Sequence, residues 1–265
     1  MTLPPGSERA EALQCSTVNP HESDPALHSL LERQQINVHQ PGGETFWHWV
    51  RFDLLARVVA QRGSAEVLDL GAGAGGLGDW TRRERPQLRY RFEELSPRLD
   101  ALLAERFGNA ARFPTDSAIE STTVVAMLDV LEHIEDDTAF LAHLAQRMQP
   151  GATLVVTVPA LQWAFTSWDT ELGHYRRYSR RQLRSALTTA GLDVQRSQYI
   201  FPELLPLLVV RKFKRAKRAD VDFPQLPAWL NRLGYWLSSC SARLRMIWPL
   251  GTSVIAVAEK AHDNG

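Results

Sequence analysis

Residues 67–76 read Val-Leu-Asp-Leu-Gly-Ala-Gly-Ala-Gly-Gly, and this stretch decides the fold. A short β-prone apolar run ends at Leu70, and glycines at alternate positions follow it. Glycine adopts backbone dihedral angles that other residues avoid and lets a ligand approach the main chain, as the first loop of an open α/β sheet requires. The stretch therefore predicts a strand, a ligand-binding loop and the start of a helix.

The rest of the chain alternates strands with helices on both sides of this unit. Apolar residues recur at helical spacing from about residue 44 to Gly63, and capping or stop residues mark the later helices. Strands are predicted at 67–70, 88–95, 123–128, 153–158, 194–200 and 253–258, with helices at 76–85, 97–107, 137–148 and 180–190. This alternation predicts an α/β fold, a Rossmann-like doubly wound and mostly parallel sheet whose last strand is antiparallel.

The chain divides by composition into four regions. Residues 1–43 are polar and are expected to form a flexible N-terminal tail. Residues 44–202 form the predicted core, residues 203–250 a helical and basic insertion, and residues 251–265 the last core strand with a C-terminal tail.

Composition excludes several classes of protein. The 265 residues contain 30 basic and 30 acidic side chains, so a nucleic-acid binder that relies on overall charge is excluded. Two distant cysteines exclude a disulfide framework and a cysteine-based zinc site. No signal peptide and no apolar run of membrane-spanning length is visible, so a cytoplasmic protein is expected, with membrane association left open.

Two carboxylates flank the glycine loop and bear on its ligand. Gly71, Gly73 and Gly76 also match the GxGxxG pattern of nicotinamide sites. Asp69, however, lies two residues before the first glycine, where a phosphate gains nothing from it and a cationic amino group would. Glu94 ends the second predicted strand and suits a ribose diol in either kind of ligand.

Several motifs in order resemble one family. They are VLDLGAGAGG at 67–76, EELSP at 93–97, LDVLEHIEDD at 128–137 and PGATLVVTVPA at 150–160. FWHWVRFDLLARVV precedes them, and WDTELGHYRRYSRRQLRSALTTAGL follows. Together they resemble class I S-adenosylmethionine-dependent methyltransferases of the small-molecule type that carry an HYRRY segment. The resemblance covers residues 44–202 and the final strand.

The resemblance implies a role for each matching residue around the cofactor. The glycine loop would face the methionine part, with Asp69 at its amino group, Glu94 on the ribose and Leu95 beside the adenine. Asp116, ending a third strand, would touch the adenine amine, and Asp129 would close the pocket beside the sulfonium. The remaining implied cofactor contacts are Gly71, Ala72, Gly73 and Gly75 in the loop, Val130 after the fourth strand, and Trp47 and Arg51 on the first helix. An aromatic face there would attract a sulfonium cation, although Trp47 and Arg51 could equally pack the helix against the sheet.

Two histidines are candidate bases for an oxygen nucleophile, His133 in LEH and His174 in HYRRY. Each follows a strand end on the expected cofactor side, although His133 could instead only orient its loop. Asp129, Glu132 and His133 form a D-x-x-E-H cluster that could hold a divalent metal. We expect a structural use of that cluster and assign no metal ligand.

Two segments concentrate positive charge. Residues 174–184 contain five arginines, and residues 211–218 read RKFKRAKR. Such runs are usually solvated faces, although a nearby anion would also explain them. An apolar run before the second segment, and Trp229, Leu230, Leu233, Trp236 and Leu237 at helical spacing after it, leave three uses of residues 203–240 open: peripheral membrane contact, a dimer interface or a substrate lid.

The sequence thus predicts a methyltransferase that uses S-adenosylmethionine on a small-molecule acceptor, which the local positive charge allows to be anionic. An acceptor hydroxyl on a sugar, a quinone-like ring or a natural-product scaffold is favoured, and nucleic acid is not expected. Two alternatives remain: a nicotinamide-dependent oxidoreductase, and a methyltransferase-like protein that binds without turnover. Oligomeric state is not readable from the sequence.

Overall fold

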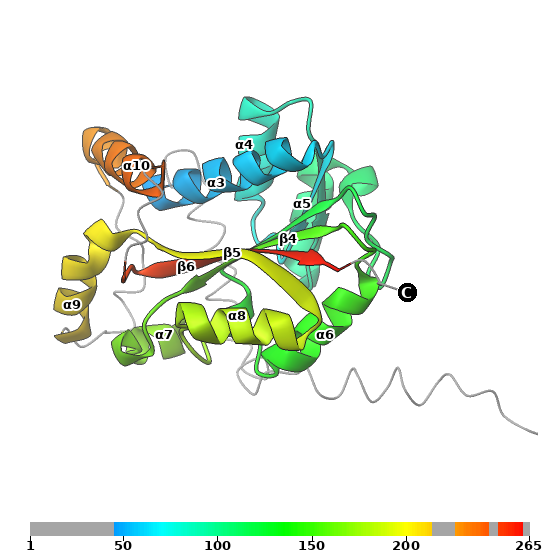
Figure 1. Ribbon diagram of the computed structural model, residues 1–265. Helices are drawn as coiled ribbons and strands as arrows, with labels where there is room; N and C mark the ends of the chain where they lie inside the picture. The colour runs from blue at the N-terminus through cyan, green and yellow to red at the C-terminus, as the bar shows by residue number, and fades with distance from the viewer. Residues whose placement is uncertain (1–44, 214–225, 244–248, 262–265) are drawn as a thin grey trace, which may run out of the picture.

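A six-stranded sheet forms the centre of the computed structural model, which describes residues 45–213, 226–243 and 249–261 (Figure 1). The strand order is β2-β1-β3-β4-β6-β5, and β2, β1, β3 and β4 run parallel while β6 is antiparallel to both neighbours. The strands are β1 (Glu66–Leu70), β2 (Arg89–Glu93), β3 (Val124–Leu128), β4 (Thr153–Pro159), β5 (Leu192–Ile200) and β6 (Ser253–Lys260). The predicted α/β sheet with an antiparallel last strand is confirmed.

Helices cover both faces of the sheet because successive strand residues point to opposite sides. One face packs Leu68, Val125 and Leu154 against α6 (Asp137–Arg147) and α8 (Arg180–Thr189). The other packs Val67 and Val155 against α3 (Phe46–Arg62) and α4 (Gly76–Glu84). Figure 1 shows α3 above the sheet and α8 below it. The remaining helices are α5 (Pro97–Phe107), α7 (Ser167–Glu171), α9 (Leu205–Phe213) and α10 (Ala228–Arg243).

Local sequence signals set where several helices begin and end. Ser96 caps α5 by accepting a hydrogen bond from the Leu99 backbone N–H, and Pro97 fills the first turn. Ser179 and Gln182 form the predicted capping box of α8. Gly63 ends α3 in the left-handed conformation, with φ +62°.

One predicted strand is absent from the sheet. The resemblance places a third strand before Asp116, but residues 112–116 contribute only an isolated bridge between Phe92 and Arg112. Asp116 lies in a turn with φ +65°, so no strand end positions it. The sheet therefore ends at β2 on this side, and β5 forms its other edge. The predicted tail, residues 1–43, lies outside the described residues.

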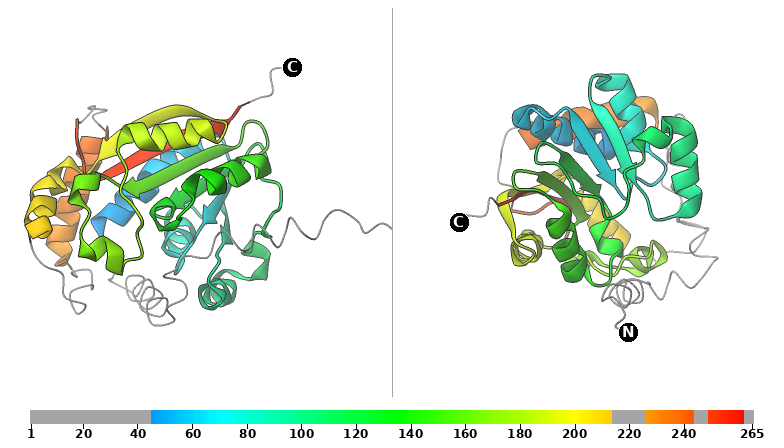
Figure 2. Two further views of the ribbon diagram at one scale, coloured as in Figure 1. Left: turned by 90° about the horizontal axis from the view of Figure 1, so that it is seen from below. Right: turned by 90° about the vertical axis from the view of Figure 1, so that its right-hand side faces the viewer.

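The chain between β5 and β6 contains α9 and α10, which both lie at one end of the molecule (Figure 1; Figure 2, left). Helix α10 packs on α3, and α9 follows directly from β5 through the short 3-10 helix η4 (Pro202–Leu204). Within the described residues, no helix is long and apolar enough to cross a bilayer.

A buried ion pair fixes the end of β2. Arg147, at the end of α6, donates to both carboxylate oxygens of Glu93 at 3.1 and 2.6 Å, and both side chains are nearly inaccessible to water. Glu93 is the last residue of β2 and immediately precedes Glu94. The pair therefore helps to position the neighbouring Glu94 carboxylate beside the glycine loop.

We predict that Arg147→Met lowers the free energy of unfolding by about 3–5 kcal/mol, because it leaves the Glu93 carboxylate buried without its partner. Urea denaturation measures this loss. Adding Glu93→Gln to the same chain should restore part of it. Arg112→Met, which removes a more exposed arginine paired with Asp100, is the matched control and should cost much less. Equal losses in the two single variants would contradict the assignment.

Candidate functional site

The glycine loop leaves β1 with its backbone uncovered for a ligand. Gly71, Gly73 and Gly75 all have positive φ angles, of 73°, 56° and 84°. At Gly71 a Cβ atom would lie 2.8 Å from a methyl group of Val130, so two residues from the predicted cofactor set are in contact. Only glycine fits both this space and this backbone conformation. At Gly75, a Cβ would meet α5 side chains, so packing there also requires glycine.

Asp69 lies buried in β1 beneath this loop. The Tyr90 hydroxyl donates a hydrogen bond to its Oδ2 at 2.9 Å. Burial, and to a lesser degree the charge of Glu94, raise the pKa of Asp69 to about 7. A cationic ligand beside Asp69 would stabilise the ionised form of this buried carboxylate. This fits the cationic amino group that the sequence suggests as its partner.

Glu94 joins the loop to the next helix. Its carboxylate accepts hydrogen bonds from the backbone N–H groups of Gly73 at 2.8 Å and Ser96 at 2.9 Å. Burial raises the pKa of Glu94 above its usual value. Leu95 beside it is 78% exposed, so its side chain is open to a ligand that lies on this loop. The structure thus brings Asp69, Glu94 and the glycine loop together.

Asp129 and Arg51 form an ion pair between the end of β3 and α3. The Arg51 guanidinium lies 2.9 Å from Oδ2 of Asp129 and donates to the Ser253 hydroxyl at 3.2 Å. It also lies 5.4 Å from the centre of the Phe201 ring. The Thr157 hydroxyl donates to the other Asp129 oxygen at 3.1 Å. Arg51 therefore links α3 to the ends of β3, β5 and β6 through contacts within the protein.

A cavity of about 250 Å³ opens beside this ion pair. Trp47 and Arg51, four residues apart on α3, both line it, as does Asp129. Most of the other lining side chains are apolar, among them Trp168, Leu172, Phe201, Leu204, Leu207 and Leu208. The glycine loop contributes no lining residue, so Trp47 and Arg51 face a second compartment next to the predicted cofactor site.

His174 lines this cavity with a buried carboxylate behind it. Its Nδ1 lies 3.2 Å from Oδ1 of Asp169, which also accepts from the Arg177 guanidinium at 2.7 Å. Burial would raise the pKa of Asp169, but hydrogen bonds from His174 and Arg177 outweigh it and lower this pKa to about 2. Because Asp169 is ionised and can only accept, the hydrogen bond places a hydrogen on Nδ1 of His174, and Nε2 is the ring nitrogen left to exchange a proton.

The HYRRY segment is held against the loop that follows β3. The Tyr175 backbone N–H donates to the Glu132 carbonyl at 2.8 Å, and the Tyr178 hydroxyl donates to Asp137 at 2.7 Å. Arg176 pairs with Asp137 at 3.1 Å. Arg177 is buried, so this part of the arginine-rich segment is not the solvated face that we expected. Both arginines neutralise acids of the protein itself.

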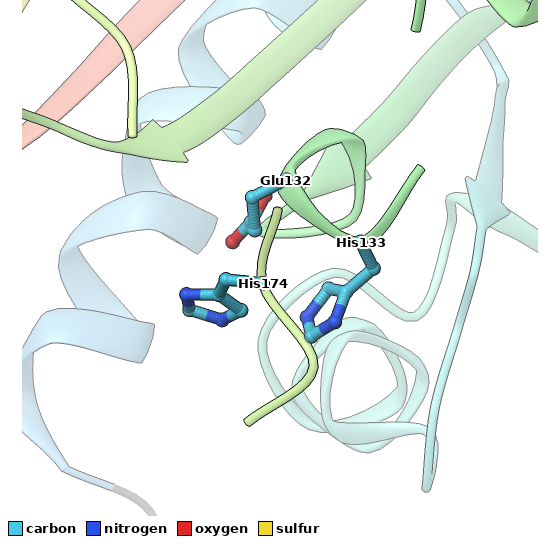
Figure 3. Close-up of side chains that lie close together, drawn as sticks. All are labelled: Glu132, His133 and His174. Atoms are coloured by element: carbon cyan, nitrogen blue, oxygen red, sulfur yellow. The ribbon is translucent and has the colours of Figure 1, made fainter. Parts of the chain in front are cut away.

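His133 and Glu132 lie beside His174, as Figure 3 shows. The rings of His133 and His174 are 4.6 Å apart and nearly perpendicular. Burial and then the neighbouring His174 lower the pKa of His133 to about 3, so its ring is neutral at physiological pH. Glu132 is buried, its Oε2 has no hydrogen-bond partner, and burial raises its pKa well above the usual range.

The group with metal-ligand spacing differs from the one considered from the sequence. Glu132, His133 and His174 each offer an atom within 4.8 Å of the others, in the part of the chain that the structure describes. Among the described residues, Asp129 does not join Glu132 and His133 in such a group, which was the set considered and not adopted from the sequence; its carboxylate contacts Arg51 and Thr157. Sequence spacing missed His174 because it comes from another loop.

Asp116 is placed differently from the expectation. Its side chain is largely exposed and lies 3.0 Å from Nε2 of His143 on α6. This contact, rather than a strand end, orients the carboxylate. Its predicted contact with the adenine amine stays a prediction.

Sequence reasoning also missed several residues around the cavity, above all Asp169. The capping box formed by Thr166 and Asp169 indicates the start of α7 and could have been found in the sequence. The motif does not indicate that the Asp169 carboxylate also contacts His174. Phe201 and Ser253 were missed because they reach the cavity only through the antiparallel pairing of β5 and β6.

The raised pKa of Asp69 predicts a pH-dependent stability. The folded protein holds this proton up to about pH 7 and the unfolded chain releases it near 3.8, so the free energy of unfolding falls as pH rises between these values. From pH 5 to pH 8 we expect Asp69→Asn to gain up to about 3 kcal/mol relative to the unchanged protein. Urea denaturation at both pH values tests this. Asp193→Asn, at an exposed position, should show no such gain.

Comparison with known proteins agrees with this geometry. Residues 46–197 match the family described as "Methyltransferase domain". A protein from Mycolicibacterium smegmatis, provisionally named an S-adenosylmethionine-dependent methyltransferase, is 29% identical over an alignment of 177 positions that covers 60% of this chain and 63% of that protein. The chain therefore spans less than two thirds of the length of this relative.

Two solved structures share the fold at low sequence identity. One, provisionally named a sarcosine dimethylglycine methyltransferase from Galdieria sulphuraria, is 15% identical with a TM-score of 0.51 over 79% of this chain and 85% of that one. The other comes from a complex of the Haloferax volcanii activator Trm112 with a protein provisionally named a methyltransferase, at 16% identity and a TM-score of 0.51 over 91% of this chain and 96% of that one. With a family match over more than half of its length and the strand order described above, the chain belongs to the methyltransferase-domain family and has the fold of class I S-adenosylmethionine-dependent methyltransferases.

Proposed function

We propose that this protein transfers a methyl group from S-adenosylmethionine to a hydroxyl group of a small molecule, with His174 as the base. One observation carries the assignment of the base: His174 lines the cavity beside Asp129 while the buried Asp169 carboxylate holds its Nδ1–H. This arrangement leaves Nε2 able to take a proton. A base is what an oxygen nucleophile needs and a good nitrogen nucleophile does without.

The residues around the glycine loop fit the cofactor. Gly71 offers bare backbone where any side chain would meet Val130, and Asp69 offers a buried carboxylate for an amino group. Glu94 and the exposed Leu95 would take the ribose and the adenine. The GxGxxG match also fits nicotinamide, but a phosphate would gain nothing from Asp69. These residues all belong to the cofactor set that the sequence motifs imply.

The reaction needs alignment and one proton transfer. When bound, S-adenosylmethionine supplies an electrophilic methyl group on a sulfonium. The methyl carbon would pass from the sulfur to the acceptor oxygen, and Nε2 of His174 would take the hydroxyl proton. The Arg51–Asp129 pair holds α3 against the end of β3 beside the cavity. Alignment of the acceptor oxygen with the methyl group can supply on the order of 7–11 kcal/mol. The products are a methyl ether and S-adenosylhomocysteine.

His133 suits a supporting role better than a catalytic one. Its pKa near 3 makes it a weak base at neutral pH, and it does not line the cavity. Its ring packs edge to face against His174 and so fixes the orientation of that ring. The structural reading of the LEH motif is therefore favoured for His133.

The lining of the cavity narrows the acceptor class. Tryptophan, phenylalanine and leucine side chains dominate it, which favours a quinone-like ring or another apolar scaffold over a free sugar. The two arginines that line it, Arg51 and Arg177, are already paired with Asp129 and Asp169. The geometry therefore gives no added support to an anionic acceptor.

We predict that His174→Asn lowers kcat by about 10²- to 10⁴-fold and leaves the Kd for S-adenosylhomocysteine within about twofold. Release of S-adenosylhomocysteine with a panel of hydroxylated quinones, phenols and sugars measures the rate, and calorimetry measures the Kd. The control is Asp193→Asn, which changes an exposed residue of β5 that lines neither the cavity nor the glycine loop. Full activity of the His174 variant would reject this base, and cofactor binding without turnover on any acceptor would favour a non-catalytic protein.

We also predict that exhaustive chelation leaves the initial rate within about twofold, because the proton is taken by an imidazole. The assay compares protein dialysed against EDTA with protein supplied with Mg²⁺, Mn²⁺ or Zn²⁺. Loss of activity that a divalent ion restores would instead make Glu132, His133 and His174 metal ligands and replace the proposed role of His174.

A further inference from the structure

Helix α10 turns its polar face toward the protein. Asn231 accepts a hydrogen bond at 2.6 Å from the backbone N–H at the start of α3, and Ser238 donates to Glu203. Tyr235 donates to Asp53 of α3. At Gly234, a Cβ atom would lie 2.6 Å from the Phe46 ring, so the two helices touch there. The face that holds α10 on the molecule is made of small and hydrogen-bonding residues.

The opposite face of α10 is apolar and exposed. Trp229 is 68% exposed and Trp236 is 61% exposed, seven residues apart on the same side of the helix. The other large apolar side chains exposed on this helix are Leu230, Leu233 and Leu237. A surface helix of a soluble protein normally buries this stripe and exposes its polar one. The inverted arrangement indicates that something apolar meets α10.

Helix α9 lies at the same end of the molecule as α10 and also exposes apolar side chains (Figure 1; Figure 2, left). Leu207, Val209 and Val210 are exposed along it. Lys212 of α9 lies 4.8 Å from the centre of the Trp163 ring, which is itself exposed, and its ammonium donates to the Trp163 carbonyl. We call the exposed apolar residues of α9 and α10, together with Trp163, the apolar end surface.

The charge of these two helices is of one sign. Their sequences, LPLLVVRKF and AWLNRLGYWLSSCSAR, contain four basic residues and no acidic one. In the sequence that follows α9, four further basic residues come within five positions, Lys214, Arg215, Lys217 and Arg218. Tryptophan and leucine beside lysine and arginine are the composition with which peripheral proteins meet anionic lipid.

We propose that the apolar end surface docks this protein onto an anionic membrane, with Trp229 and Trp236 inserted at the level of the lipid headgroups. A symmetric dimer through the same surface is disfavoured, because it would bring two helix pairs of uniform positive charge together. The surface also adjoins the cavity: Leu207 is 63% exposed and lines it. If the proposed function holds, an amphiphilic acceptor can pass from the bilayer into the cavity beside α9.

Vesicle flotation of the full chain tests this proposal without an acceptor. We expect the protein to float with vesicles of phosphatidylcholine that contain about a third phosphatidylglycerol, and to bind pure phosphatidylcholine at least about tenfold more weakly. Trp229→Gln with Trp236→Gln should lower binding to the anionic vesicles at least tenfold. Because both side chains are exposed, thermal melting and S-adenosylhomocysteine binding should not change, which separates this result from failure of the proposed function.

A matched pair of charge reversals supplies the control. Lys212→Glu with Arg232→Glu should abolish flotation, since each basic residue contributes about fivefold near an anionic surface. Arg181→Glu with Arg184→Glu alters the net charge equally on exposed positions of α8 and should leave flotation intact. The proposal is overturned if both pairs behave alike, if the unchanged protein does not float, or if sedimentation shows a dimer that only the tryptophan variant dissociates.

Discussion

The ion pair between Arg51 and Asp129 joins the two halves of the site, and the remaining geometry depends on it. Asp129 follows β3 next to Val130, which touches the glycine loop, while Arg51 reaches across from α3. The guanidinium also contacts Ser253 of β6 and the Phe201 ring after β5. One buried side chain therefore ties a helix and three strand ends together, and breaking it would leave a charge in a poorly hydrated place.

Behind the cavity, the Asp169 carboxylate links several neighbouring groups, as Arg51 links more distant ones. It accepts hydrogen bonds from Thr166, His174 and Arg177, so one ionised group caps α7, sets the tautomer of the histidine and neutralises a buried arginine. The same contacts give the HYRRY segment a structural role, because its backbone and side chains bind the loop after β3 and the carboxylate of α7. The hydrogen bond to Asp169 and the packing against His133 hold the imidazole in one orientation, which would limit reorganisation if His174 acts as the base that we propose.

The end of the molecule near the cavity is built on a different rule. There, α10 is held by hydrogen bonds and close backbone approach, and its large apolar side chains remain outside. A fold that stabilises a helix through its polar face leaves the apolar face available for an external surface. The same end carries Leu207, which belongs to both that surface and the cavity. Access to the site and attachment of the protein are thus linked by one short helix.

The sequence by itself determined the sheet, the glycine loop and the acidic residues beside it. These features follow from local rules: apolar runs of strand length, capping residues such as Ser96, and positive φ angles at Gly71 and Gly73 that favour glycine. The strand predicted before Asp116 is absent from the sheet, because strand formation depends on pairing with a partner strand and not on local propensity alone.

The tertiary structure alone decided which groups meet at the cavity. Asp169 and His174 form a pair, Asp129 binds Arg51 instead of joining Glu132, and Arg177 is buried instead of solvated. It also decided which side of α10 faces outward. Sequence periodicity shows that a helix has two faces, but packing against α3 selects the face that is buried, because only residues without bulk fit against Phe46.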